Sequence, residues 1–203
     1  EVIAAARVGQ GEVEEALGGL LPANRHAAQL AADALHRALA GVAASSQRLA
    51  EPADDRVLVA MSGGVDSAVA GLLERERGAE VLAVTVKLWA DPETDGAKAC
   101  CSPEAVLGAR ALTHQLGIPH FTLDLEGPFR ERVVDEFLRG YGEGRTPNPC
   151  VLCNGEVRLA AMVDLADRVG AGCLVTGHYA RVVEDEHGAL IAAGSDESKD
   201  QSY

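Results

Sequence analysis

Hydrophobic positions recur with helical spacing over the first part of the chain. Residues 1–50 are rich in Ala and Leu, and their pattern predicts helices that break at Gly18-Gly19 and Pro22. The second of these helices is expected over residues 24–42. Three leucines are expected near one face of it: Leu30, Leu35 and Leu39.

After a linker expected at residues 51–55, short apolar runs alternate with amphipathic ones. Strands are predicted at residues 56–60, 81–86, 120–123 and 173–176. Helices are predicted at residues 65–77, 103–116, 128–141 and 156–169. Short, continuously apolar strands separated by helices are typical of a parallel sheet with helices on both faces. The expected fold class is therefore α/β, with a short helical segment before a domain that spans residues 56–203.

Beyond the last of these strands, the pattern predicts a hairpin. Its strands are expected at residues 180–184 and 189–193, joined by a turn at His187-Gly188. Ligands of parallel sheets bind beyond the carboxyl ends of the strands. That rule predicts one crevice shared by three segments, residues 62–67, 86–89 and 176–179.

A glycine turn joins the first predicted strand to the helix after it. Its sequence is Ser62-Gly63-Gly64-Val65-Asp66-Ser67. Glycines let the backbone come close to a ligand, and the first amides of a helix have no partner within it, so an anion fits there. The serine hydroxyls can donate to the same anion, and Asp66 can hold a cation or cap the helix. An ordinary strand-to-helix turn is the alternative, but the order of serines and aspartate favours a phosphate site.

A second candidate site is the proline-rich stretch at residues 144–154, which contains two cysteines. Pro147 and Pro149 predict a loop, because proline lacks an amide donor and restricts the residue before it. Cys150 and Cys153 then precede the start of a helix, where the local field favours a thiolate. Such a thiolate can be a nucleophile, a metal ligand or half of a redox pair, and a purely structural pair stays open as an alternative.

The composition of the chain limits its partners and surroundings. Its 18 Lys and Arg against 31 Asp and Glu give a net charge of −13, which argues against a nucleic-acid partner because phosphate contacts need cations. No apolar run reaches the roughly 18 residues that a membrane span requires, so no membrane partner is expected. The five cysteines, in a chain with a nucleotide loop, are expected to be reduced thiols in the cytoplasm.

Four motifs occur in order along the chain. They are Ser-Gly-Gly-Val-Asp-Ser at 62–67, Gly-Arg-Thr-Pro-Asn-Pro-x-x-x-Cys-Asn at 144–154, Thr-Gly-His-Tyr at 176–179 and Ser-Lys-Asp-Gln-Ser-Tyr at 198–203. With them, residues 56–203 resemble the bacterial tRNA-specific 2-thiouridylases, PP-loop enzymes of the N-type ATP pyrophosphatase superfamily. The resemblance implies an adenine nucleotide alpha-hydrolase-like fold that binds ATP with Mg²⁺. It also implies that ATP adenylates the C2 oxygen of the wobble uridine of tRNA, and that sulfur from an enzyme persulfide then displaces AMP.

The resemblance implies a role for each matching residue. Those expected to bind the nucleotide are Ala60, Met61, Ser62, Gly63, Gly64, Val65, Asp66, Ser67, Val86 and Gly177. Those expected to contact the tRNA are Asn148, Pro149, Cys150, Lys199, Asp200 and Gln201. Cys153 matches the first catalytic cysteine, and a sulfur-donor protein, either a cysteine desulfurase or a sulfur relay, is the implied partner. His178 stays outside the catalytic set, because a general base and a structural histidine are equally open.

Two departures from the family pattern concern the cysteines. Many members carry Asp at the position of Cys150, so its pairing with Cys153 raises a regulatory disulfide or two ligands of an iron–sulfur cluster. A third ligand would be Cys100, Cys101 or a cysteine beyond Tyr203. The family's second catalytic cysteine lies downstream of its last motif and has no match here. We therefore expect a piece of a longer protein, able to bind ATP but not to complete sulfur transfer.

Two features outside the motifs have simpler interpretations. Cys173 begins a strand predicted to be buried and is expected to be a small core residue. Residues 1–50 faintly resemble the end of the U-type iron–sulfur scaffold proteins, but Ala27 or Ala28 stands where their ligand cysteine would fall. A plain helical extension is therefore favoured, with a degenerate scaffold remnant as the alternative.

Two other functions compete with tRNA thiolation. One is another PP-loop adenylating ligase or amidotransferase acting on a small carboxylate. The thiol of Cys153 argues against it, because a glutamine-dependent ligase has no use for that group. The other is an iron–sulfur-dependent thiolation or sulfur-carrier module, which the five cysteines and the leading helices suggest.

Overall fold

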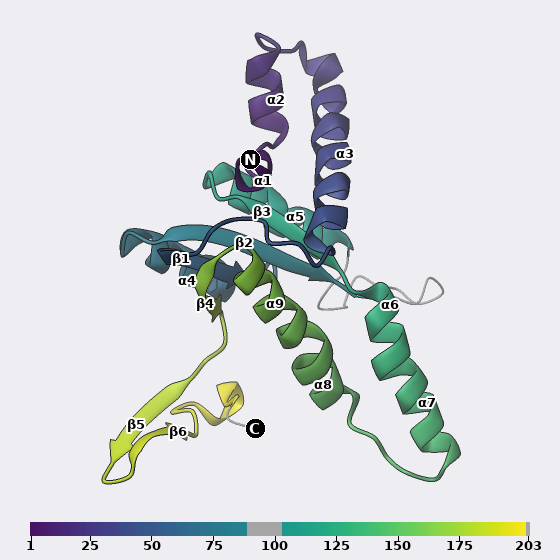
Figure 1. Cartoon of the computed structure of the whole chain (residues 1–203), viewed down its shortest axis with the longest axis vertical. Helices are drawn as coiled ribbons and strands as arrows, with labels where there is room; N and C mark the ends of the chain where they lie inside the picture. The colour runs from purple at the N-terminus through teal and green to yellow at the C-terminus, as the bar shows by residue number, and fades with distance from the viewer. Residues whose placement is uncertain (89–102, 202–203) are drawn as a thin grey trace.

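The computed structural model describes residues 1–88 and 103–201 (Figure 1). Four parallel strands form one sheet in the order β3-β2-β1-β4. Their bounds are Ala53–Ala60 for β1, Glu80–Lys87 for β2, His120–Asp124 for β3 and Ala171–Thr176 for β4. The predicted hairpin consists of β5, Arg181–Asp185, and β6, Gly188–Ala192. The predicted parallel sheet and the separate hairpin are both confirmed.

Most helices begin and end close to the predicted positions, but the helix predicted at residues 156–169 begins seven residues earlier, at Pro149. In chain order they are α1 Val2–Ala5, α2 Gln10–Ala16, α3 Arg25–Ala43, α4 Val65–Glu76, α5 Pro103–Gln115, α6 Glu126–Phe129, α7 Asp135–Gly142, α8 Pro149–Leu152 and α9 Ala160–Arg168. None of the helices in the described ranges is both long enough and apolar enough to cross a membrane.

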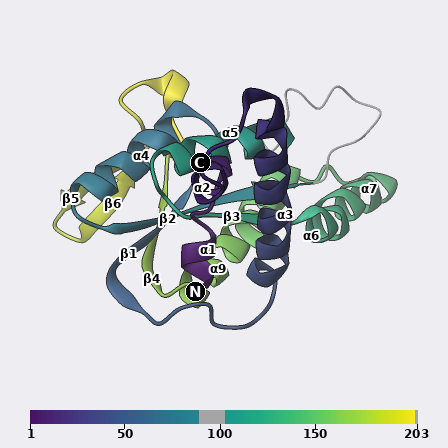
Figure 2. The same cartoon turned by 90° about the horizontal axis from the view of Figure 1, so that it is seen from above.

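Alternate residues of each strand point to opposite faces of the sheet, and helices cover both faces. Val57 and Val59 share a core cluster with Ala109 of α5. Leu58 shares the other core cluster with Leu165 of α9. Figure 2 shows the strands between α4 and α5 on one side and α1 and α9 on the other. The α/β class is therefore confirmed, and the carboxyl ends of the strands are where a ligand can enter.

The leading helices pack directly on the sheet. The amide of His120 in β3 donates to the carbonyl of Ala6 at 2.9 Å. Leu39 and Ala43 of α3 belong to the same core cluster as the central strands. The Nη2 atom of Arg168 donates to the carbonyl of Ala43 at 2.7 Å. Residues 1–50 therefore share the hydrophobic core of the sheet.

One expectation for α3 is wrong, because Leu30 is 65% exposed. The buried face consists of Ala28, Ala32, His36, Leu39 and Ala43. A helix turns by about 100° per residue, so Leu30 lies roughly 200° around the axis from Ala28. The small alanines allow α3 to approach the sheet closely.

Three histidines meet where α3 packs on α5 and β3. The ring centroid of His36 is 4.8 Å from that of His114 and 6.4 Å from that of His120. The Nε2 atom of His36 donates to the carbonyl of Val8 at 2.9 Å. Burial lowers the pKa of His36, lowers that of His120 well below its usual value, and lowers that of His114 to about 4, where the neighbouring His36 and Arg110 add to the effect. The cluster is therefore packed in its uncharged form.

We expect the protein to lose stability as the pH falls from 7.5 to 5. The folded-state pKa of His114, about 4, lies below the unfolded value of 6.5, so the unfolded chain takes up more protons in this interval. The stabilisation is complete above pH 6.5 and is lost as the pH falls towards 4. Circular dichroism should show a midpoint lower by about 5 °C at pH 5. A His114→Asn variant should weaken this dependence and the exposed His187→Asn should keep it; an unchanged dependence in both would contradict the assignment.

The predicted linker is shorter than expected, because β1 begins at Ala53. The amide of Ala53 donates to the carbonyl of Gly170 at 3.0 Å. Asp54 and Asp55 are exposed within the strand. Two exposed acids interrupt the apolar pattern, so hydrophobicity alone places the start of the strand too late.

The prediction that Cys173 is a core residue is wrong. β4 lies at the edge of the sheet, and both Gly172 and Cys173 are exposed there. An edge strand has a neighbouring strand on one side only, so small side chains near its start stay accessible.

The stretch at residues 144–154 is a loop only as far as Asn148. Pro149 occupies the first position of α8, where its missing amide donor costs nothing and its fixed φ suits the helix. The side-chain oxygen of Asn148 caps this helix by accepting from the amide of Cys150 at 3.1 Å. Both cysteines therefore lie within the helix. The prediction that they precede the start of the helix, in a loop set by the two prolines, is wrong.

The helix that begins at Pro149 continues to Arg168 through a π-helical segment, Cys153–Leu159. A similar segment, Arg130–Val134, joins α6 to α7. Figure 1 shows these two long helices projecting from the same end of the sheet and connected by a loop at their far ends. The helix that begins at Pro149 carries both motif cysteines, and its second half packs on the sheet.

Candidate functional site

A cavity of about 220 Å³ opens at the carboxyl ends of β1, β2 and β4. Its lining comprises Ala60, Met61, Ser62, Gly64, Asp66, Ser67, Val84, Val86, Arg158, Met162, Thr176, Gly177, His178 and Gln201. The predicted meeting of the segments after the three strands is confirmed, although Trp89 lies outside the described residues. Eight of the ten predicted nucleotide residues line this cavity; Gly63 and Val65 do not.

Hydrogen bonds within the glycine turn shape the wall of the cavity. The Ser62 amide donates to Ser67 Oγ at 3.2 Å, and the Ser67 hydroxyl donates to the Gly64 carbonyl at 3.0 Å. Gly63 has a φ of +79°, a conformation that L side chains rarely adopt. The turn therefore depends on both serines and on this glycine, and it presents the start of the twelve-residue helix α4 to the cavity.

Gly177 brings the end of β4 against the start of α4. A Cβ atom added at Gly177 would lie 2.6 Å from the amide nitrogen of Ser67 and 2.9 Å from its Cα. Real Cβ atoms do not approach backbone atoms so closely, so only glycine fits this position. The predicted closing of the site by Gly177 thus has a steric basis in the backbone of Ser67.

Asp66 faces the cavity and also contacts Tyr179. The Tyr179 hydroxyl donates to Asp66 Oδ1 at 3.0 Å, and this bond to a carboxylate raises the pKa of Tyr179. The Tyr179 amide donates to Gln201 Oε1 at 2.9 Å. The C-terminal motif is thereby connected to the glycine turn through one tyrosine.

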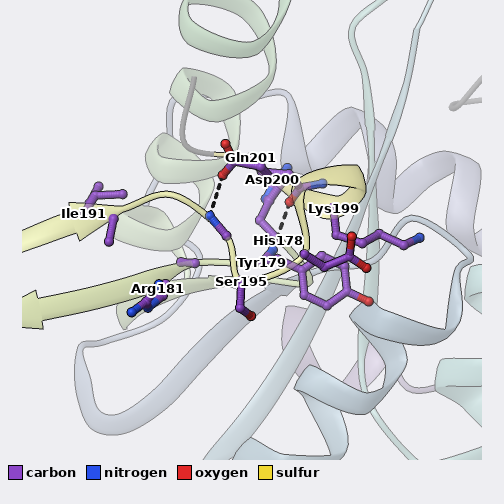
Figure 3. A pocket seen from close by; sticks show the side chains of 12 residues that line it. His178, Tyr179, Arg181, Ile191, Ser195, Lys199, Asp200 and Gln201 are labelled. Atoms are coloured by element: carbon purple, nitrogen blue, oxygen red, sulfur yellow. Dashed lines mark hydrogen bonds between the residues drawn. The ribbon is translucent and has the colours of Figure 1, made fainter.

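A second pocket of about 670 Å³ lies between the hairpin and the C-terminal segment (Figure 3). Lys199, Asp200 and Gln201, all expected to contact tRNA, line it. His178 and Gln201 also line the cavity beside the glycine turn, so the two hollows share a wall. The ring of His178 is oriented by a 2.8 Å hydrogen bond between its Nδ1 atom and Thr176 Oγ1.

The structure does not bring the cysteine motif into the lining of the smaller cavity. Cys150 is exposed, whereas Cys153 is half-buried and packs against the core cluster. Asn148 lines a separate hollow of about 660 Å³ together with Arg145 and Pro147. The link between the motif and the cavity is instead the continuous helix, because Arg158 lies five residues beyond Cys153 and does line the cavity.

Sequence reasoning missed three lining residues: Val84, Arg158 and Met162. Arg158 and Met162 are four residues apart, so they occupy one face of the helix that carries the cysteines. This spacing was the one sequence signal for them, and it is not specific because it occurs in any amphipathic helix.

Within residues 1–88 and 103–201, no group of three or more His, Cys, Asp or Glu side chains is arranged to hold a metal ion. Cys100 and Cys101, the proposed sources of a third cluster ligand, lie outside the described residues. Cys150 and Cys153 lie on successive turns of one helix, so any such ligand would have to come from elsewhere.

A family model described as the tRNA methyl transferase HUP domain matches residues 55–203. The whole chain is 48% identical to the bifunctional protein NifU/MnmA of Rubrobacter xylanophilus and spans 42% of that protein. It is 50% identical, over 73% of its length, to 39% of the tRNA-specific 2-thiouridylase MnmA of Sorangium cellulosum. Against 43% of the tRNA-specific 2-thiouridylase MnmA 2 of a Thermoanaerobacter species, the identity is 43% over 74% of the chain.

The chain thus spans less than half the length of these curated relatives. The family match begins at residue 55, within β1, and includes the glycine turn, the cysteine motif and the C-terminal motif. The match to the Rubrobacter protein also includes the leading helices. The resemblance drawn from the four motifs is confirmed, and the chain belongs to the family of the tRNA methyl transferase HUP domain.

Proposed function

We propose that this chain is the ATP-binding and adenylating part of a tRNA-uridine 2-sulfurtransferase. The observation that carries the proposal is the cavity between the Ser62–Ser67 turn and Gly177, where the absence of a Cβ brings β4 against the start of α4. Relatives named tRNA-specific 2-thiouridylase support the choice of reaction over other ATP-dependent ligations.

The residues of the cavity suit a nucleotide. The Ser62 hydroxyl and the first turn of α4 offer donors to phosphate oxygens, and Val86 at the end of β2 offers an apolar wall to the base. Asp66 is the carboxylate that would hold Mg²⁺. Bound ATP supplies the adenylyl group that activates the C2 oxygen of the wobble uridine, and pyrophosphate leaves.

The sulfur step is assigned to Cys153. As a persulfide its outer sulfur would attack C2 of the activated uridine, with AMP as the leaving group. A second thiol, from the part of the relatives that this chain does not span, would then attack Cys153 Sγ and break the S–S bond, so that 2-thiouridine is released and the two cysteines are left as a disulfide. Asn148, Pro149 and Cys150 precede it on the same motif and are proposed to contact the target base. Lys199, Asp200 and Gln201 line the larger pocket and are proposed to contact the tRNA, and a cysteine desulfurase or sulfur relay would load the thiol.

The net charge of −13 disfavours binding of RNA phosphates by this chain. We propose that most of the cationic surface for tRNA belongs to the part of the relatives that this chain does not span. We propose that the protein acts in the cytoplasm, where thiols stay reduced, because persulfide chemistry at Cys153 needs a reduced thiol.

We further infer that residues 1–50 derive from the scaffold half of a fused protein. Support comes from the match of the entire chain to a relative named bifunctional protein NifU/MnmA. Alanine stands at positions 27 and 28, where the scaffold ligand would fall, so we assign this segment a packing role and no metal.

The proposal is tested with the full-length protein that contains this chain. Mixed with ATP, Mg²⁺, a persulfide donor and a tRNA transcript, it should release pyrophosphate and form 2-thiouridine, measured by mass spectrometry of the nucleosides. Pyrophosphate release that requires glutamine and a small carboxylate would favour an amidotransferase instead. After anaerobic purification, a colourless protein without bound iron would exclude the cluster role for Cys150 and Cys153.

A further inference from the structure

Arg158 enters the nucleotide cavity from the face opposite to α4. The α4 side of the cavity presents the glycine turn, and α4 covers the same face of the sheet as α5. Arg158 and Met162 belong to the helix whose buried residues are part of the other core cluster. A ligand in the cavity would therefore lie between the turn on one side and Arg158 on the other.

The charges around the cavity single out this residue. Among the described residues that line it, Arg158 has the only Lys or Arg side chain and Asp66 has the only carboxylate. A nucleotide with several phosphates brings more negative charge than the serines and amides of the turn can neutralise. The cavity therefore has a cationic side chain in its wall, although the chain as a whole has a net charge of −13.

The guanidinium of Arg158 has unused hydrogen-bonding capacity. Its Nε atom is buried and has no hydrogen-bond partner among the described residues. Its Nη1 atom donates to Asn154 Oδ1 at 3.3 Å, beyond the usual range for a strong bond. Buried donors are almost always paired, so an unpaired one beside a cavity points to a ligand oxygen as its partner.

We propose that Arg158 binds the phosphate nearest the ribose, the one that stays in the adenylate. This inference rests on the proposed nucleotide site. The glycine turn and the start of α4 would hold the two outer phosphates, and Val86 would contact the base. The phosphate attached to the ribose lies between these groups and would face the wall opposite α4, where Arg158 lies. A guanidinium suits it, because its fork of donors binds two phosphate oxygens at once.

The position of Arg158 ties this phosphate to the proposed nucleophile. Cys153 lies five residues earlier on the same continuous helix. Asn154, the current partner of Arg158, directly follows Cys153. The side chain proposed to bind the adenylate phosphate and the proposed nucleophile, Cys153, thus lie on one continuous helix.

Equilibrium binding of ATP and of AMP, each with Mg²⁺, to the full-length protein tests the assignment. Arg158→Gln should weaken both ligands by a similar factor, about tenfold or more, because AMP retains the contacted phosphate. Arg158→Lys should show a smaller loss, since it keeps the charge but not the fork. The matched control is Arg139→Gln on α7, which removes an exposed cation paired with Glu136 and should change neither affinity. Thermal melting checks that each variant is folded.

Equal AMP affinity in wild type and Arg158→Gln would overturn the assignment, and so would a loss confined to ATP, which would place Arg158 at the outer phosphates. If Arg158→Gln does not fold, the comparison of AMP with ATP is made on Arg158→Lys, with the same two outcomes. A wild-type protein without affinity for ATP would instead contradict the proposed function, so the two failures are distinguishable.

Discussion

Replacing Cys153 with Ser in the full-length protein is expected to abolish 2-thiouridine formation while ATP still binds. A serine hydroxyl cannot carry a persulfide, so the rate of thiolation should fall about a thousandfold or more, as when other catalytic nucleophiles are removed. Cys153 does not line the nucleotide cavity, so the ATP affinity should stay within about twofold of wild type. Nucleosides from tRNA of cells that depend on the variant, and calorimetry with ATP, measure the two effects.

The matched control for this variant is Cys173→Ser. Cys173 is also a cysteine of the chain, but it lies exposed on the edge strand β4. Its replacement should leave thiolation unchanged. Normal 2-thiouridine levels with Cys153→Ser would contradict the assignment of Cys153 as the nucleophile.

Replacing Gly177 with Ala is expected to remove most nucleotide binding. The added methyl group would lie 2.6 Å from the Ser67 nitrogen and 2.9 Å from the carbonyl carbon of Asp66, and neither backbone atom can rotate away. Either the end of β4 or the start of α4 must shift, and the glycine turn moves with α4. We expect a loss of ATP affinity of about tenfold to a hundredfold, with a cost of about 1–3 kcal/mol in the free energy of unfolding.

Gly172→Ala provides the matched control on the same strand. A Cβ at Gly172 would lie 3.7 Å from the nearest atom, the carbonyl oxygen of Asp54, which is ordinary van der Waals contact. This variant should therefore bind ATP as wild type does. Binding by Gly177→Ala that matches the control would show that the close approach at Ser67 is not needed for the site.

The mistakes in the sequence-based assignments have identifiable causes. Pro149 predicted a loop, yet proline is favoured in the first turn of a helix, and the Asn148 cap decided between the two. Leu30 and Cys173 were assigned by residue type and pattern, but their burial depends on what packs above them. Local propensity cannot report that, because exposure is a property of the neighbouring elements.

The leading helices show the same limit in another form. Their pattern predicts helices correctly, but it does not predict that Ala6 accepts from the amide of His120 or that Leu39 enters the core of the sheet. The buried histidine cluster depends on this packing as well, because His36 comes from α3 while His114 and His120 come from the sheet domain.

By itself, the sequence determined the alternation of strands and helices, the class of sheet and the position of the glycine turn. Those features depend on residue order over short spans: the apolar period, the glycines at Gly63 and Gly64, and the serines beside them. Only the tertiary structure decided that Gly177 must lack a Cβ, that Tyr179 contacts Asp66, and that Arg158 reaches the cavity from the helix of Cys153. Each of these joins segments far apart in the chain, and such contacts follow from how elements pack on the sheet, which no local pattern encodes.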